Sequence, residues 1–236
     1  PNVDGTLQAP GSTATAVTGD AGINTVTVGA GGTLLASGDL GAGDDTLDIS
    51  GILDTSGGVF GLGDGDDNFV VHDGTVVMGT IDGGAGLDTR IYDINTTADL
   101  GALVNFEGVT KTGTGVLNVT GPGVTNVQEV QVLGGTLDIG AAGSLDGVQN
   151  AIVANGASLV ADGSMLFTPG ADSFTVAGNV SGSGTIDMLD GDDSLILQDG
   201  ADLTGLVTSI DGGAGTDTLT AAIGGTATLG GGTNLV

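Results

Sequence analysis

Residues 61–90 read GLGDGDDNFVVHDGTVVMGTIDGGAGLDTR and decide the fold. The stretch contains one pattern twice: a turn rich in Gly and Asp, followed by a short run of aliphatic, β-branched or aromatic residues. Gly supplies the positive φ that tight turns need, and Asp side chains accept hydrogen bonds from turn amides. β-branched and aromatic residues favour strands. The stretch therefore predicts short strands, each introduced by a tight turn.

The same pattern recurs along the chain at a nearly constant interval. It is marked by the last polar residue of the turn, which falls at Asn24, Asp45, Asp67 and Asp88. Self-similarity at a fixed period of this length is typical of solenoid architectures. The chain is therefore expected to consist of rungs of about 21 residues.

Between residues 95 and 164 the acidic turns fade while the interval persists. Leucines of successive predicted strands still recur once per rung, at Leu117, Leu137 and Leu159. The acidic turn then returns, and residues 210–220 match residues 81–91 at eight of eleven positions. We therefore expect a larger internal duplication, of residues 41–91 and 169–220, in addition to the short repeat.

The period and the alternation of side chains favour an all-β fold, a right-handed parallel β-helix (β-solenoid) with rungs of about 21 residues. Alternation predicts three pairs of inward side chains, which are Leu47 and Ile49, Phe69 and Val71, and Leu195 and Leu197. We expect residues 1–236 to form a single β-solenoid domain, and the start at Pro1 without a signal peptide indicates a fragment of a longer chain. An antiparallel sandwich is the structural alternative.

Composition narrows the classes of partner. The chain has 29 acidic residues against Arg90 and Lys111 alone, which gives a formal net charge of −27. Nucleic acids and anionic lipids require Lys and Arg for phosphate neutralisation, so neither is an expected partner. Cys and Trp are absent, Tyr92 is the only Tyr, and 49 residues are Gly. The core must therefore be narrow and aliphatic.

Several stretches resemble the passenger region of bacterial autotransporters (type V secretion), particularly the adhesin-like kind. They are GVTKTGTGVLNVTG (108–121), GGTLDIG (134–140) and GASLVADG (156–163), together with the GDGDD and GGAGLDT turns. The resemblance implies a β-helix exported to the cell surface, where it stays anchored at the outer membrane or is released. It also implies a C-terminal outer-membrane β-barrel in the full-length chain, and ligands on host-cell, bacterial or matrix surfaces.

The acidic turns also resemble the calcium nonapeptide of repeats-in-toxin proteins, GGxGxDx followed by an aliphatic residue. In that family Asp carboxylates and Gly carbonyls supply the oxygen ligands that Ca²⁺ prefers. The positions that match are Asp45, Asp67, Asp88, Asp193 and Asp217, so these are the candidate calcium ligands. The toxin motif, however, repeats every nine residues, whereas this chain has one acidic turn per rung. The alternative is that these Asp residues cap turns and keep the protein soluble.

Catalytic chemistry finds little support in the sequence. His72 is the only His and no G-x-S-x-G motif accompanies it, so we interpret it as an exposed strand residue. Lys111 lacks the GxxxxG that a phosphate-binding loop needs. The Asp pairs at 44/45, 66/67 and 192/193 repeat in equivalent turns, which indicates a structural role. Arg90 replaces the apolar residue of the second block and is expected to neutralise a carboxylate.

Three functions follow from these observations. The leading prediction is a non-enzymatic passenger or stalk segment of a cell-surface adhesin, with no catalytic or cofactor-binding residues. The first alternative is a calcium-responsive surface-layer or biofilm protein. The second is an extracellular polysaccharide-active β-helix enzyme, since parallel β-helices also carry glycosidases and paired carboxylates are their catalytic groups.

Overall fold

The computed structural model describes residues 2–3, 6–8, 15–101, 104–121, 124–222 and 228–229, and these residues form strands without helices. Among them no helix is long and apolar enough to span a bilayer. The contacts divide the chain into two compact units. The first unit comprises residues 1–93 and 102–108, and the second comprises residues 94–101 and 109–236.

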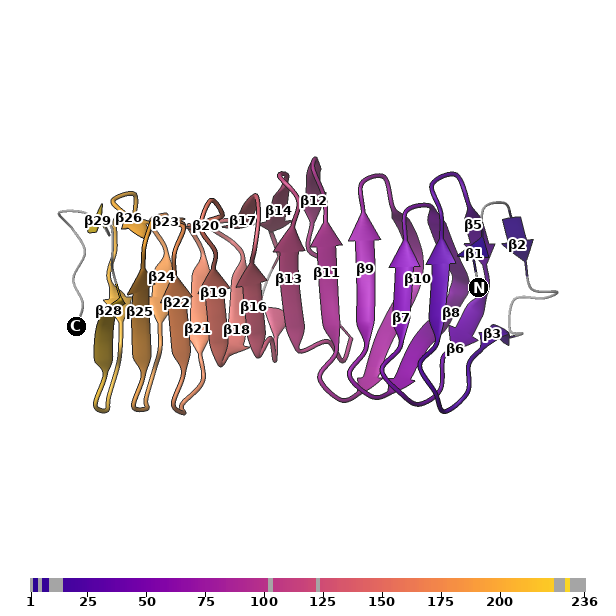
Figure 1. Ribbon diagram of the computed structural model, residues 1–236, viewed down its shortest axis with the longest axis horizontal. Helices are drawn as coiled ribbons and strands as arrows, with labels where there is room; N and C mark the ends of the chain where they lie inside the picture. The colour runs from indigo at the N-terminus through magenta and orange to yellow at the C-terminus, as the bar shows by residue number, and fades with distance from the viewer. Residues whose placement is uncertain are drawn as a thin grey trace. The chain divides into compact units, whose positions relative to one another are not determined.

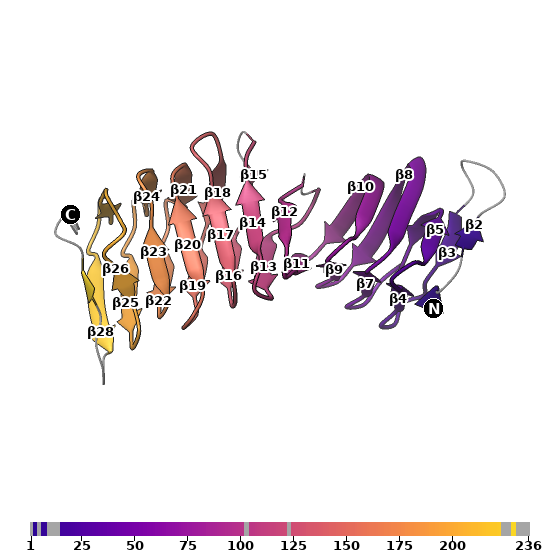
Figure 2. The same cartoon turned by 90° about the horizontal axis from the view of Figure 1, so that it is seen from above.

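The first unit contains two parallel sheets (Figures 1 and 2). One sheet has the strands β1 (Asn2–Val3), β4 (Thr25–Val28), β7 (Thr46–Ile49), β9 (Asn68–His72) and β11 (Thr89–Asp93), in that order. The other has β2 (Thr6–Gln8), β5 (Thr33–Leu35), β8 (Ile52–Asp64), β6 (Ser37–Asp39) and β3 (Thr15–Thr18), with β10 (Val76–Ala85) paired to β8. Each strand hydrogen-bonds to its equivalent one coil away, as a solenoid requires.

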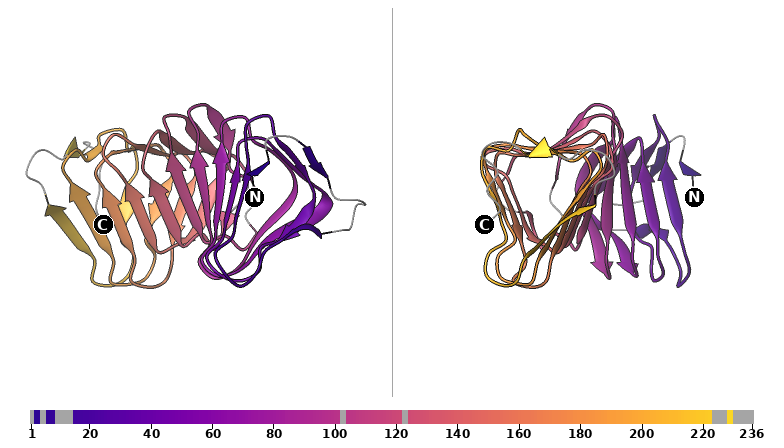
Figure 3. Two further views of the ribbon diagram at one scale, coloured as in Figure 1. Left: turned by 45° about the vertical axis from the view of Figure 1, so that its right-hand side comes forward. Right: turned by 60° about the vertical axis from the view of Figure 1, so that its left-hand side comes forward.

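The second unit contains three parallel sheets, to which successive coils contribute their strands. The first has β13 (Gly108–Thr112), β16 (Glu129–Val132), β19 (Asn150–Val153), β22 (Ser173–Val176), β25 (Ser194–Gln198) and β28 (Thr218–Ala222). The next has β12 (Thr97–Asp99), β14 (Val116–Val119), β17 (Thr136–Ile139), β20 (Ser158–Ala161), β23 (Asn179–Ser181), β26 (Asp202–Leu203) and β29 (Thr228–Leu229). The last has β15 (Val124–Thr125), β18 (Ser144–Val148), β21 (Ser164–Phe167), β24 (Thr185–Asp187) and β27 (Ile210–Asp211). The right-hand view of Figure 3 looks obliquely along these coils.

Strand register confirms the predicted rung. In the first unit Thr25 pairs with Thr46, Thr46 with Asn68, and Asn68 with Thr89, each one residue after a marker of the repeated turn. In the second unit Leu137 pairs with both Leu117 and Leu159, as their spacing predicted. The predicted parallel β-helix is therefore confirmed. The antiparallel alternative is wrong, because the strands of the described residues pair in parallel.

The interior is filled by the aliphatic and aromatic side chains that alternation predicted. All six predicted inward residues are at most 7% exposed; these are Leu47, Ile49, Phe69, Val71, Leu195 and Leu197. The intervening residues Asp48, Val70 and Ile196 are only partly buried. Burial of such side chains is the main favourable contribution to folding.

Both basic residues of the chain lie inside their coils. Arg90 occupies the register position of Phe69, and its guanidinium carbon lies 4.9 Å from the Phe69 ring centroid and 5.1 Å from that of Tyr92. Lys111 is fully buried, and its Nζ donates to the backbone carbonyls of Ile94 (3.3 Å), Gly113 (3.1 Å) and Thr112. The charged groups on the outer surface of the described residues are therefore acidic, with His72 as the one further titratable side chain.

Candidate functional site: the aspartate corner

Glycines allow the coils to touch backbone to backbone at the corner that carries the acidic turns. Gly63 and Gly84 have φ of +125° and +113°. A Cβ on Gly63 would lie 1.8 Å from the carbonyl oxygen of Gly41, and one on Gly84 would lie 1.9 Å from that of Gly63. Side chains are therefore sterically excluded, which explains why the sequence repeats Gly-x-Gly-x-Asp here.

The last Asp of each turn forms what we call the inner ladder: Asp45, Asp67 and Asp88 in the first unit, and Asp172, Asp193 and Asp217 in the second. In the first unit each Oδ1 accepts the backbone N–H of the equivalent residue one coil earlier. The donors Asn24, Asp45 and Asp67 lie 2.6, 2.6 and 2.8 Å from their acceptors. The carboxylate thus caps the turn of the neighbouring coil, not its own turn.

The preceding Asp of each pair forms an outer ladder that runs in the opposite direction. Oδ1 of Asp44 accepts the N–H of Asp66 at 3.0 Å, and Oδ1 of Asp66 accepts the N–H of Leu87 at 2.9 Å. Asp44 and Asp66 are exposed, whereas Asp45 and Asp67 are buried. The pairs Asp44/Asp45 and Asp66/Asp67 of successive coils are therefore joined by two hydrogen bonds of opposite direction. The N–H of Asp45 donates to Asp67 in the inner ladder, and the N–H of Asp66 donates to Asp44 in the outer ladder.

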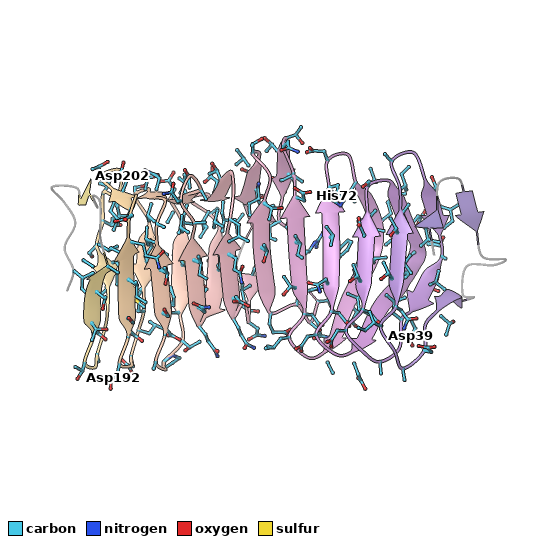
Figure 4. The ribbon with its side chains drawn as sticks, viewed as in Figure 1. Asp39, His72, Asp192 and Asp202 are labelled. Atoms are coloured by element: carbon cyan, nitrogen blue, oxygen red, sulfur yellow. The ribbon has the colours of Figure 1, made fainter. Side chains whose placement is uncertain are left out.

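The second unit repeats this arrangement. The N–H of Asp172 donates to Oδ1 of Asp193 at 2.9 Å, and that of Asp193 donates to Oδ1 of Asp217 at 3.2 Å. The outer bond also recurs, because the N–H of Thr216 donates to Oδ1 of Asp192 at 2.8 Å. Figure 4 places Asp192 at the tip of a turn, away from the strands.

Two ladder positions, Glu107 and Asp172, escaped prediction. Glu107 ends the ladder of the first unit, since its Oε2 accepts the N–H of Asp88 at 3.1 Å. Asn24, the first marker of the repeated turn, begins that ladder as a donor. In the second unit the Asp172 carboxylate bonds to Thr168 N (2.9 Å) and Oγ1 (2.8 Å) in its own turn. Spacing is the one sequence signal that would have identified Glu107, because Glu107 follows Asp88 by slightly less than one rung of about 21 residues.

Four buried carboxylates of the inner ladder have one oxygen without a partner among the described residues. Asp45, Asp67, Asp88 and Asp193 are at most 2% exposed, and their Oδ2 atoms are buried and accept no hydrogen bond from the described residues. Desolvation, reinforced by neighbouring carboxylates, raises the pKa of Asp88 to about 6. Burial likewise raises the pKa of Asp67, Asp172 and Asp193, although the amide hydrogen bonds oppose the shift.

The structure places the predicted calcium ligands in hydrogen bonds between coils. In Asp45, Asp67, Asp88 and Asp193 one oxygen accepts a backbone N–H and the other is buried, and Asp217 is exposed. Among the residues that the structure describes, no three His, Cys, Asp or Glu side chains converge on a common point. Ca²⁺ takes six to eight oxygen ligands. The ladder is a hydrogen-bonded column in this structure.

The other candidate residues are also accounted for by structural contacts. His72 lies on the outer face of β9, with Nε2 3.0 Å from Asp48 Oδ1 and Nδ1 3.4 Å from Asp93 Oδ2 (Figure 4). Its side chain is 30% exposed, so it is less open than predicted. Tyr92 is 1% exposed and is not accessible for stacking on a sugar ring. The Asp pairs serve in coil stacking, as their repetition indicated.

Comparisons with known proteins identify no family for this chain. The chain matches no protein-family model, and neither the curated proteins nor the solved structures yield a match. The resemblances to autotransporter passengers and to calcium nonapeptides therefore stay predictions.

Proposed function

We propose that this chain is a structural display module, a stalk or adhesive segment of a bacterial cell-surface adhesin similar in role to an autotransporter passenger. The proposal places the module outside the cell, with ligands on host cells, other bacteria or extracellular matrix. It assigns no catalytic residue, because the paired carboxylates of the acidic turns are engaged with backbone amides of neighbouring coils.

The observation that carries the proposal is that the basic side chains lie in the interior and the acidic side chains of the turns lie on the surface. The two basic side chains point inward, while the first-position Asp residues of the turns, such as Asp44, Asp66 and Asp192, are exposed. Such a surface is strongly hydrated and repels other copies of the chain, which suits a module presented at high density. Successive coils are meanwhile joined by strand pairing and by the aspartate corner. A surface of this kind favours ligands with a basic patch.

The proposal is tested by displaying the chain on beads. Beads that carry the folded chain are incubated with immobilised host-cell, bacterial and matrix ligands at low and at physiological salt. We expect binding to at least one ligand, and we expect it to weaken as salt rises, because exposed charges are screened over about 10 Å at 0.1 M salt. Circular dichroism on the same preparation establishes that the chain is folded.

Two controls decide whether binding is specific. Soluble polyaspartate added in excess competes for any surface that recognises negative charge alone, so binding that survives it depends on the fold. A heat-unfolded preparation of the same chain has the same charge and should bind less. Absence of binding by the folded chain across all three ligand classes would contradict the adhesive role.

A further inference from the structure

Four carboxylates of the inner ladder, those of Asp45, Asp67, Asp88 and Asp193, combine three features. They are buried, they occupy positions that repeat from coil to coil about 4.8 Å apart, and their Oδ2 atoms accept no hydrogen bond from the described residues. Asp45, Asp67 and Asp88 form such a run in the first unit, and Asp193 repeats the arrangement in the second. An ionised carboxylate whose oxygen is buried without a hydrogen bond is costly, and the neutral acid is the form that such a site favours.

The charges that act on these carboxylates are negative. Asp67 faces Asp45, Asp44 and Asp66, and Asp88 faces Asp67, Glu107 and Asp66. The nearest cation along the chain, Arg90, stacks against the Phe69 and Tyr92 rings inside the coil. Like charges at this separation disfavour simultaneous ionisation.

The acidic groups around the second-unit ladder are arranged similarly. Asp172 faces Asp193, and Asp193 faces Asp217 and Asp192. Asp217 is exposed, so the column becomes more solvated toward this position. The first unit, with three consecutive buried members, therefore contains the longer run of carboxyl oxygens that lack a partner among the described residues.

We propose that the buried carboxyls of the inner ladder bind protons when the coils stack, so that the solenoid is more stable in mild acid than at neutral pH. The Oδ1 atoms keep their amide hydrogen bonds in both states, and the proton resides on Oδ2. Neutralising Oδ2 removes a buried charge and the repulsion between neighbouring carboxyls. The ladder thus makes the stability of the coils respond to pH.

The direction of the response follows from linkage. The pKa of Asp88 is about 6 in the folded chain, against 3.8 for an ordinary Asp. The folded state therefore binds more protons than the unfolded state between these values, and stability falls as pH rises through this window. The penalty is absent below the ordinary Asp pKa and is fully present above the raised pKa of Asp88. Most proteins with hydrogen-bonded carboxylates lose stability in acid instead.

The test uses urea unfolding of the full chain at pH 4.5 and pH 7.5, followed by far-ultraviolet circular dichroism. The variants are Asp88→Asn, which keeps an acceptor at Oδ1 and stays neutral, and Asp64→Asn, which removes the same formal charge from an exposed position that is not among the groups acting on Asp67 or Asp88. For the wild type and Asp64→Asn, we expect the unfolding equilibrium constant to rise roughly tenfold or more between the two pH values. In Asp88→Asn the rise should be several-fold smaller, and the variant should be more stable than the wild type at pH 7.5.

Equal pH dependence in Asp88→Asn and Asp64→Asn would overturn the proposal, because general charge repulsion would then explain the effect. If Asp88→Asn does not fold, carboxyl ¹³C NMR of the wild type decides the question. The carboxyl resonance of Asp88 should titrate near pH 6. Titration of Asp88 near the ordinary Asp value of 3.8 would equally overturn the proposal.

Discussion

The backbone N–H of Asp45 donates to Oδ1 of Asp67, in the next coil, at 2.6 Å. The carbonyl of Asp45 accepts the N–H of Asn68 at 2.9 Å, so both backbone polar groups of Asp45 are satisfied by the next coil. A buried backbone group without a partner would cost about 1–3 kcal/mol. The Asp67 side chain therefore joins successive coils at the corner, as backbone hydrogen bonds between paired strands join them along the sheets.

Replacing Asp67 should reveal the value of this acceptor. Asp67→Ala leaves the buried N–H of Asp45 unsatisfied, whereas Asp67→Asn keeps an oxygen at the same place. We expect Asp67→Ala to have a free energy of unfolding about 1–3 kcal/mol below that of Asp67→Asn, measured by urea unfolding at pH 7.5. Comparing these two variants removes the effect of charge, since both lack the carboxylate. Equal stabilities would show that the hydrogen bond contributes nothing.

Glycine at the corner should be indispensable where coils touch. Gly63→Ala places a Cβ 1.8 Å from a backbone oxygen at a positive φ, so we expect a loss of at least about 2 kcal/mol in the free energy of unfolding. Gly61, on the same strand β8, has no atom within 4 Å of the place that a Cβ would occupy and provides the matched control. Gly61→Ala should change stability by less than about 1 kcal/mol. Similar losses in the two variants would contradict the steric account.

Calcium should have no specific effect on stability. The inner ladder offers no group of three converging ligands among the described residues. Adding millimolar CaCl₂, and then removing it with EDTA, should change the melting temperature no more than the same concentration of MgCl₂ does, because both cations screen the acidic surface equally. A rise with calcium that magnesium does not reproduce would contradict this expectation and support the alternative prediction of a calcium-responsive protein.

Most of the fold was predictable because a solenoid repeats one local rule. The spacing from Asn24 to Asp88 set the rung length, and the alternation at Phe69 and Val71 set the buried face; the structure confirms both. The register of coils then follows, since a shift of one residue would expose every inward side chain.

The aspartate corner was only half predictable. The recurrence of Asp45 and Asp67 indicated a structural role, but a single coil does not reveal that each carboxylate caps the preceding coil. Glu107 lies outside any acidic turn and takes its place through the length of its side chain. The inward direction of Lys111 was missed as well, because Lys is rarely buried and its partners are backbone carbonyls that leave no signature in sequence.

Hydrogen exchange at the amides of Asp45 and Asp67 tests the central claim, that the inner ladder joins successive coils. Both residues lie in turns, where amides usually exchange fast, yet each donates to a carboxylate of the next coil. We predict protection comparable to that of the strand amides of β9, and selective loss of Asp45 protection in Asp67→Ala. Fast exchange at both amides in the folded wild-type chain would contradict the account.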